Sequence, residues 1–162
     1  MSFNGILNVY KPKGFTSRDI VNIVRKIYNT KKVGHAGTLD PNATGVLPIV
    51  IGNATKIVDY IQTMGKSYIG EMTLGIETDT LDIWGKSIDS KVINYNKNIF
   101  FDVIQNYDNK KIMQMPPMFS ALKKDGKRLY ELARNGIEIE REKREVDIYS
   151  LLILNFYDNK IR

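Results

Sequence analysis

The stretch that most constrains this chain is residues 33–49, which place the only histidine, three glycines and two prolines directly before an apolar run. The glycines and prolines argue against a core strand or helix, because they interrupt regular structure. The apolar residues at the end of the stretch argue against a surface linker. The pattern indicates a rigid loop that presents one carboxylate, Asp40, from the edge of a sheet. A carboxylate held in this way can act as a nucleophile or a base without a metal or a cofactor.

The composition narrows the chemistry further. The 162 residues include no cysteine and a single histidine, His35, which excludes disulfides, iron–sulfur clusters, thiolate zinc sites and imidazole-rich metal sites. No apolar stretch is long enough to span a bilayer, and the N-terminus lacks the charged and apolar regions of a signal peptide. We therefore expect a cytoplasmic protein with no metal, no cofactor and no membrane association.

The positive charge is concentrated in the first part of the chain. The net charge is +6, and residues 1–66 carry all of it with nine Lys or Arg against three Asp, because residues 67–162 hold fifteen charges of each sign. A basic face beside a carboxylate suggests a polyanionic partner whose phosphates are attracted by Lys and Arg. Charge alone also fits a merely solvated basic surface, since an excess of six is modest.

Hydrophobic periodicity predicts a mixture of helices and strands, an α+β pattern without the regular alternation of a parallel sheet. The expected strands cover 5–10, 46–51 and 68–76, with further strand patterns within 137–156 that include 138–140. The expected helices cover 18–29, 53–63, 99–106 and 127–135. Ser17 and Asn53 are candidate N-caps, and Pro48 predicts an edge or irregular position for its strand.

Other chemistries fit the central segment less well. Residues 40–51 imitate the start of an EF-hand calcium loop, but the twelfth position is Ile51, where a bidentate Glu is needed. Residues 34–45 are not followed by the Gly-Lys-Ser/Thr of a P-loop. The composition does not exclude a Ser/His/Asp triad, although no serine lies in a nucleophile-elbow motif. A metal-free hydrolase that uses Asp40 stays a distant alternative.

Each candidate residue also has an ordinary structural interpretation. A lone histidine such as His35 is usually structural, and Asp40 before a proline commonly starts a turn. Tyr68 in a strand would usually be a core aromatic, and Lys11-Pro12 would usually be a turn after a strand. The functional interpretation gains weight because all of these residues lie in one short, basic part of the chain.

The order of these residues resembles the TruB family of tRNA pseudouridine synthases. The matching motifs run in order through nearly the whole chain: Gly5-Ile6-Leu7, Lys11-Pro12-x-Gly14-x-Thr16-Ser17, Gly34-His35-Ala36-Gly37-Thr38-Leu39-Asp40-Pro41-x-Ala43-Thr44-Gly45-Val46-Leu47-Pro48, Gly52-x-Ala54-Thr55-Lys56, Lys66-x-Tyr68, Thr78-Asp79-Thr80-x-Asp82, Gln114-x-Pro116-Pro117-x-Phe119-Ser120-Ala121-x-Lys123 and Gly126-x-Arg128-Leu129-Tyr130-Glu131-x-Ala133-Arg134. The last motif resembles the stand-alone bacterial and organellar type rather than the guide-RNA-dependent type.

The resemblance implies isomerisation of uridine 55 in the TΨC loop of tRNA. It implies that Asp40 is the catalytic carboxylate, either adding to the nucleotide or assisting a glycal-type path, and that Tyr68 stacks on the target base and handles a sugar proton. His35 would occupy the stacking space that the flipped nucleotide leaves. Lys11 and Pro12 would shape the pocket behind Tyr68, and Lys56 would contact the RNA backbone. The remaining residues implied to bind RNA are Gly34 and Thr38.

The resemblance also implies a fold, a mixed, mainly antiparallel sheet with flanking helices, incomplete at the C-terminus. The family continues into a strand with a Lys-Gly-Thr-Tyr-Ile-Arg motif and often a C-terminal RNA-binding domain. Residues 1–162 are therefore expected to be the N-terminal portion of the catalytic domain, without that RNA-binding domain. The motif arginine pairs with the family's catalytic aspartate, so its absence makes a non-catalytic tRNA-binding or RNA-folding module the alternative function.

Overall fold

The chain divides into two compact units, which we call unit 1 (Met1–Ser67) and unit 2 (Tyr68–Arg162). The computed structural model describes residues 3–120 and 122–162. Within these residues no helix is both long and apolar enough to cross a bilayer. The boundary between the units coincides closely with the end of the basic part of the sequence, so unit 1 carries the excess of positive charge.

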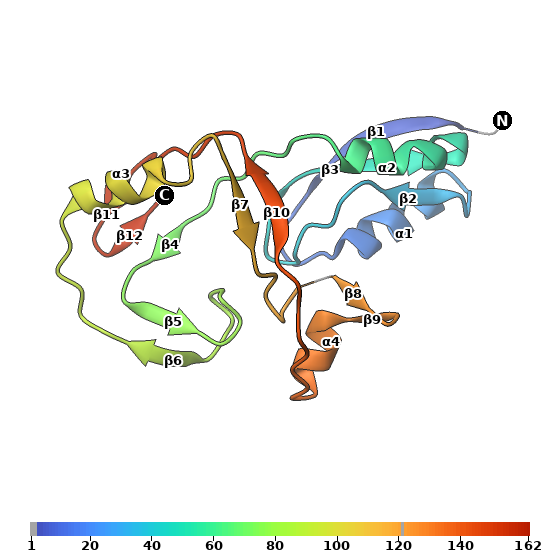
Figure 1. Ribbon diagram of the computed structural model, residues 1–162. Helices are drawn as coiled ribbons and strands as arrows, with labels where there is room; N and C mark the ends of the chain where they lie inside the picture. The colour runs from blue at the N-terminus through green and yellow to red at the C-terminus, as the bar shows by residue number, and fades with distance from the viewer. Residues whose placement is uncertain (1–2, 121) are drawn as a thin grey trace. The chain divides into compact units, whose positions relative to one another are not determined.

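Unit 1 is a three-stranded antiparallel sheet with a helix on one face (Figure 1). Its elements are, in chain order, β1 Gly5–Lys11, α1 Ser17–Ile27, β2 Val33–His35, β3 Gly45–Ile51, the 3-10 helix η1 Gly52–Ile57 and α2 Val58–Gln62. The strand order is β1–β3–β2, and Ile49 of β3 lies opposite both Leu7 of β1 and His35 of β2. The loop that holds Asp40 therefore joins an edge strand to the central strand.

The core of unit 1 lies between α1 and the sheet. Alternate residues of a strand face the same side, so β3 directs one set of apolar side chains toward the helix. The buried residues of this cluster are Ile20, Val21, Val24, Val33, Leu47, Ile49 and Ile51. Partly buried Leu7, Val9, Tyr28 and Leu39 pack against them. Leu39 thus fixes the loop to the core at the residue before Asp40.

Truncation of the central core residue is expected to be costly. Ile49 is fully buried, so Ile49→Ala removes apolar contacts and leaves a cavity, which we expect to destabilise unit 1 by about 2–5 kcal/mol. Chemical denaturation followed by circular dichroism measures this change. Val46→Ala, on the same strand but 64% exposed, is the matched control and should cost less than half as much. Equal losses for both variants would contradict the described core.

The first helix begins one residue earlier than predicted, because Thr16 and not Ser17 is the N-cap. The Thr16 hydroxyl accepts from the N–H of Asp19, and the Asp19 carboxylate accepts from the N–H of Thr16 in return, forming a capping box. The hydrogen bonds from Thr16 also lower the pKa of the Asp19 carboxyl. The hydroxyl of Ser17 is therefore free for another use, which is described below.

Two other sequence predictions for unit 1 are corrected. Asn53 does not cap the second helix, which starts as η1 after Ile51 with no side-chain cap; the Asn53 side chain accepts from Lys32 Nζ at 2.9 Å instead. Pro48 lies on the central strand, not at an edge. Its C=O accepts from Ala36 N at 2.9 Å, just beyond the last residue of β2. In a strand, the N and the C=O of one residue face the same neighbouring strand. The N of Pro48, which carries no hydrogen, therefore faces the place where the pairing with β2 ends.

Among its described residues, unit 2 contains four small antiparallel sheets and two helices. The elements are β4 Met72–Thr73, β5 Ile76–Thr78, β6 Ser87–Ser90, α3 Lys97–Gln105, β7 Lys110–Gln114, β8 Lys123–Lys124, β9 Lys127–Arg128, α4 Leu129–Arg134, β10 Arg144–Ile148, β11 Phe156–Tyr157 and β12 Lys160–Ile161. The strands pair as β10–β7, β11–β12–β4, β5–β6 and β8–β9. The two helices confirm the predictions near 99–106 and 127–135.

The predicted strand over 68–76 is wrong in its extent. Residues 68–71 are not in a strand, and β4 and β5 are separated by a turn at Gly75. Gly75 has φ +81°, and a Cβ built there would lie 2.3 Å from the C=O of Lys91, so the turn requires glycine. Residues 138–140, which alternate like a strand, are not in a strand either.

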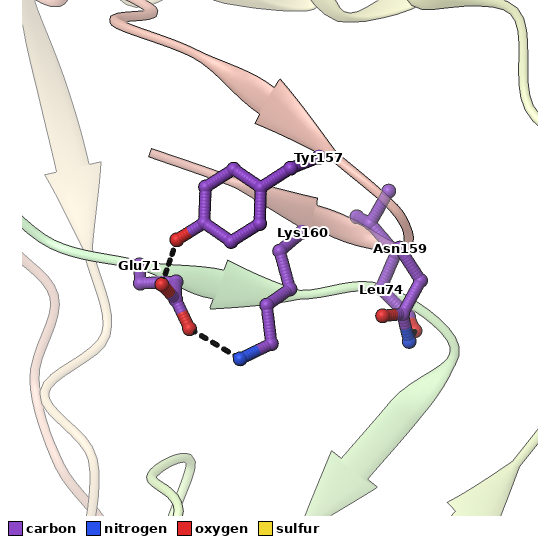
Figure 2. Close-up of polar contacts among 5 residues, drawn as sticks. All are labelled: Glu71, Leu74, Tyr157, Asn159 and Lys160. Atoms are coloured by element: carbon purple, nitrogen blue, oxygen red, sulfur yellow. Dashed lines mark hydrogen bonds and ion pairs between the residues drawn. The ribbon is translucent and has the colours of Figure 1, made fainter.

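Polar contacts hold β4 to the β11–β12 hairpin (Figure 2). Lys160 Nζ lies 2.7 Å from Glu71 Oε1, and the Tyr157 hydroxyl donates to the other oxygen of the same carboxylate. Asn159 Nδ2 donates to the C=O of Leu74 at 3.2 Å. These contacts tie residues 71 and 74, on either side of β4, to the hairpin.

Candidate active site

Asp40 lies at an exposed turn between β2 and β3. The N–H of Ala43 donates to the C=O of Asp40 at 3.0 Å, which closes a four-residue turn with Pro41 at its second position, a favoured place for proline. Three residues earlier, Gly37 has φ +114°, a backbone conformation that residues with a Cβ rarely adopt. Within the described part of the chain, the Asp40 carboxylate has no hydrogen bond or ion pair. It is open to an incoming ligand.

The residue before Asp40 is anchored by Ser17. The Ser17 hydroxyl accepts from the N–H of Leu39 at 3.0 Å and donates to the C=O of Leu39 at 3.2 Å. Ser17 is 4% exposed, so water competes little for these bonds. A single side chain therefore satisfies both polar groups of one loop residue and ties the loop to the start of α1.

The residue after Asp40 is anchored by Lys11. This lysine is fully buried, and its ammonium donates to three backbone carbonyls, those of Phe15 at 2.7 Å, Pro12 at 3.1 Å and Pro41 at 3.3 Å. An ammonium has three N–H donors, so all of them are used within the protein. The N–H of Gly14 also donates to the C=O of Pro41, at 2.8 Å. Lys11 thus joins the end of β1, the loop before α1 and the turn at Asp40.

The other predicted residues of unit 1 surround this turn in the sequence and differ in exposure. His35 ends β2, is half-buried, and its Nδ1 contacts the C=O of Gly37. Pro12, Thr38 and Lys56 are exposed, and Lys56 lies on η1. Gly34 lies beside Val50, and a Cβ built there would be at an ordinary van der Waals distance of 3.5 Å from Val50 Cγ2.

Tyr68 belongs to unit 2, where it lines a cavity of about 470 Å³. The wall is largely apolar and is formed by residues near β4, by α3 and by the chain around residues 151–154. The Tyr68 side chain is 73% exposed. Glu71 and Arg162 are the charged residues of the lining. The flat ring of Tyr68 is therefore available to a planar ligand.

The electrostatics of unit 1 favour an anionic partner. Seven of the nine basic side chains of residues 1–66 are exposed: Lys13, Arg18, Lys26, Lys31, Lys32, Lys56 and Lys66. Asp40 is one of only three acidic residues in the same stretch. Within the described residues, no group of three or more His, Asp or Glu side chains is arranged to hold a metal ion. The arrangement suits acid–base or nucleophilic chemistry on a phosphate-bearing substrate.

Sequence reasoning missed Ser17 as an anchor and the burial of Lys11. Both left a signal. Thr16 and Ser17 are adjacent hydroxyl residues, and a helix start uses only one as its N-cap. Lys11 follows Leu7 and Val9 at the period of two that places side chains on the core face of β1.

Comparison with solved structures defines the class of fold. Chains in an H/ACA RNP bound to a substrate RNA containing 2′-deoxyuridine and in a Cbf5–Nop10–Gar1 complex superpose with TM-scores of 0.64 and 0.62, at 24% and 23% identity. The matches cover 97% and 99% of this chain but 35% and 38% of those chains. The α+β fold predicted from the sequence is thus a fold that this chain shares with the matched chains of these complexes.

The family follows from sequence comparison. Residues 25–162 match the model of the TruB family pseudouridylate synthase (N terminal domain), and the chain belongs to this family. It is 49% identical to tRNA pseudouridine synthase B of Alkaliphilus oremlandii over 98% of this chain and 52% of that relative. It is 52% identical to tRNA pseudouridine synthase B of Listeria monocytogenes over 94% of this chain and 50% of that relative. The chain spans about half the length of these relatives.

Proposed function

We propose that this protein converts uridine to pseudouridine in tRNA, with uridine 55 of the TΨC loop as the target. The observation that carries the proposal is the exposed carboxylate of Asp40, free of partners within the described residues and held between anchored neighbours, in a segment that matches the TruB family. The names of the relatives, tRNA pseudouridine synthase B, support the activity and the substrate class. A tRNA substrate favours a cytoplasmic location for the protein.

The proposed reaction is an isomerisation. The N1–C1′ bond of the nucleotide breaks, the uracil turns while it stays bound, and C5 bonds to C1′. The hydrogen on C5 leaves as a proton and N1 gains one, so no oxidant or reductant is required. Asp40 either adds to the nucleotide or assists a glycal-type path. The substrate base must leave its stack to reach the carboxylate, as in other enzymes that act on a base.

The other residues are given roles that suit their chemistry. Tyr68 stacks on the target base through its exposed ring, and its hydroxyl handles a sugar proton. His35 enters the space that the flipped nucleotide leaves. Lys56, Pro12, Gly34 and Thr38 contact the RNA or shape its site. Lys11 acts by holding the loop that carries Asp40, since its three donors are already bonded.

We also propose that residues 1–162 form the N-terminal portion of the catalytic domain. The match to a family model described as an N terminal domain supports this assignment. A second candidate function is a tRNA-binding or RNA-folding module without turnover. It is favoured by the basic surface of unit 1, which suits binding to an RNA backbone.

Tritium release from tRNA labelled with [5-³H]uridine tests the proposal, because the C5 hydrogen is lost when C5 bonds to C1′. We expect release from a tRNA transcript and none from the same transcript with cytidine at position 55. Release that is independent of position 55 would overturn the proposed target. Binding of both transcripts without any release would favour the second candidate.

Binding to tRNA is expected to weaken with salt. With roughly 4–6 phosphate contacts, log affinity should fall against log salt with a slope near −0.9 per contact on duplex RNA, or about −0.7 per contact on single strands. Filter binding between about 50 and 200 mM salt measures the slope. Lys56→Ala should reduce the magnitude of this slope by about the amount expected for one phosphate contact. Lys91→Ala, which removes a unit 2 lysine paired with Asp89 at 2.8 Å, should leave it unchanged. A flat response would show that the charge excess is incidental.

A further inference from the structure

The Cα–Cβ direction of Asp40, from which its carboxylate extends, is set by the backbone on which it sits. Its carboxylate has no partner within the described residues, so no side-chain contact aims it. The peptide groups around it are bonded on both sides, through Leu39 to Ser17 and through Pro41 to Gly14 and Lys11. Whatever fixes these peptide groups therefore fixes the Cα–Cβ direction from which the carboxylate of Asp40 extends.

Ser17 contributes the most specific of these anchors. One hydroxyl accepts from the Leu39 N–H at 3.0 Å and donates to the Leu39 C=O at 3.2 Å. A hydroxyl has one donor and can do both only when its proton faces the carbonyl. The two bonds together define the position and the rotation of Leu39, whose side chain also packs against the core.

The hydroxyl of Ser17 has no other task in the fold. The N-cap of α1 is Thr16, which forms the capping box with Asp19. Ser17 is the first helical residue, where alanine has the higher helix propensity. Ser17 is buried, and its hydroxyl forms hydrogen bonds with the loop rather than with the helix.

We infer that Ser17 is a positioning residue that holds Asp40 in its reactive orientation through Leu39. The catalytic consequence rests on the proposed function, whereas the anchor itself does not. Loss of the hydroxyl leaves the two polar groups of Leu39 unpaired, so the turn at Asp40 shifts. A displacement of about 1 Å of a catalytic group costs on the order of a hundredfold in rate.

The test compares Ser17→Ala with Thr16→Ala, which removes the adjacent hydroxyl that serves only the helix. Amide hydrogen exchange by NMR and single-turnover tritium release are measured for both variants and for the wild type. We expect Ser17→Ala to speed exchange at Leu39 at least tenfold, with Ile49 and Ile51 unchanged as reporters of an intact fold. The rate should fall about 10–100-fold with unchanged tRNA affinity. Thr16→Ala should change neither the Leu39 exchange relative to Ile49 nor the rate, and Ser17→Thr, which keeps a hydroxyl, should restore part of both.

Two results would overturn the inference. In the first, wild-type Leu39 exchanges as fast as exposed Thr38, so that no anchor exists. In the second, exchange at Leu39 accelerates in Ser17→Ala while the single-turnover rate stays at the wild-type value. If the wild-type chain makes no pseudouridine, the proposed function fails and exchange alone decides the anchor: faster exchange in Ser17→Ala supports it, and unchanged exchange overturns it.

Discussion

Asp40→Asn is expected to lower the rate of pseudouridine formation by on the order of 10²–10⁴-fold. The amide keeps the shape of the side chain but cannot act as a nucleophile or a base. Because the carboxylate is exposed and makes no hydrogen bond or ion pair within the described residues, we expect the stability of unit 1 to change by less than about 0.5 kcal/mol. Single-turnover tritium release gives the rate, and filter binding gives the affinity for tRNA, which should change by less than about threefold.

Asp59→Asn is the matched control for this prediction. Asp59 is an exposed carboxylate of the same unit, on α2, and within the described residues its side chain makes no hydrogen bond or ion pair. It removes the same charge at another place, so its rate should stay near the wild-type value. If Asp40→Asn kept more than half of the wild-type rate, Asp40 would not be the catalytic carboxylate.

Lys11→Met is expected to destabilise unit 1 by about 3 kcal/mol or more. Methionine preserves most of the apolar stem, but the carbonyls of Phe15, Pro12 and Pro41 lose the ammonium that they share. Lys11 is fully buried, so water cannot easily replace it. Native-state hydrogen exchange at Ile49 and Ile51, in the core of unit 1, measures the free energy of unfolding.

Two variants control for the loss of charge and of volume at Lys11. Lys56→Met removes an exposed lysine of the same unit and should change stability by less than about 0.5 kcal/mol. Lys11→Arg keeps the charge but should not restore stability, because the planar guanidinium does not fit a buried site shaped for a compact ammonium. Stability of Lys11→Met equal to that of the wild type would show that the three contacts contribute nothing to the fold.

The strands β1 and β3 and the helix α1 were predictable because their apolar residues repeat with a clear period, whereas β2 was missed, because its three residues lie in the stretch expected to be a loop. β1 and β3 were found within one residue of their ends, since alternate positions face α1. The N-cap was assigned to the wrong member of the Thr16–Ser17 pair, because either hydroxyl can accept from a helix N–H. Pro48 was expected at an edge or irregular position, whereas it lies on the central strand where the pairing with β2 ends, and a sequence does not reveal where the neighbouring strand stops.

Unit 2 was less predictable because its elements are short and depend on distant partners. Residues 68–76 alternate in hydrophobicity, yet the turn at Gly75 divides them, and that turn is set by the approach of Lys91. The strand β4 has two residues and pairs with β12, which lies almost ninety positions later in the chain. No local pattern specifies a pairing of that kind.

The sequence names a set of candidate site residues but does not give their geometry. The breakers and the lone carboxylate in residues 33–49 pointed to Asp40, which is exposed as expected. Lys11 was expected to shape the pocket behind Tyr68, and its bonds to the carbonyls of Phe15, Pro12 and Pro41 were not predicted. Its burial follows from its place on the inward face of β1, a signal that the positive charge concealed.

All the groups that steady the turn at Asp40 lie between the start of β1 and the end of β3: Lys11, Gly14, Ser17 and Ala43. During synthesis the ribosome has released this entire set before most of unit 2 has been translated. The turn that presents Asp40 can therefore form early on the nascent chain, before most residues of unit 2 are added.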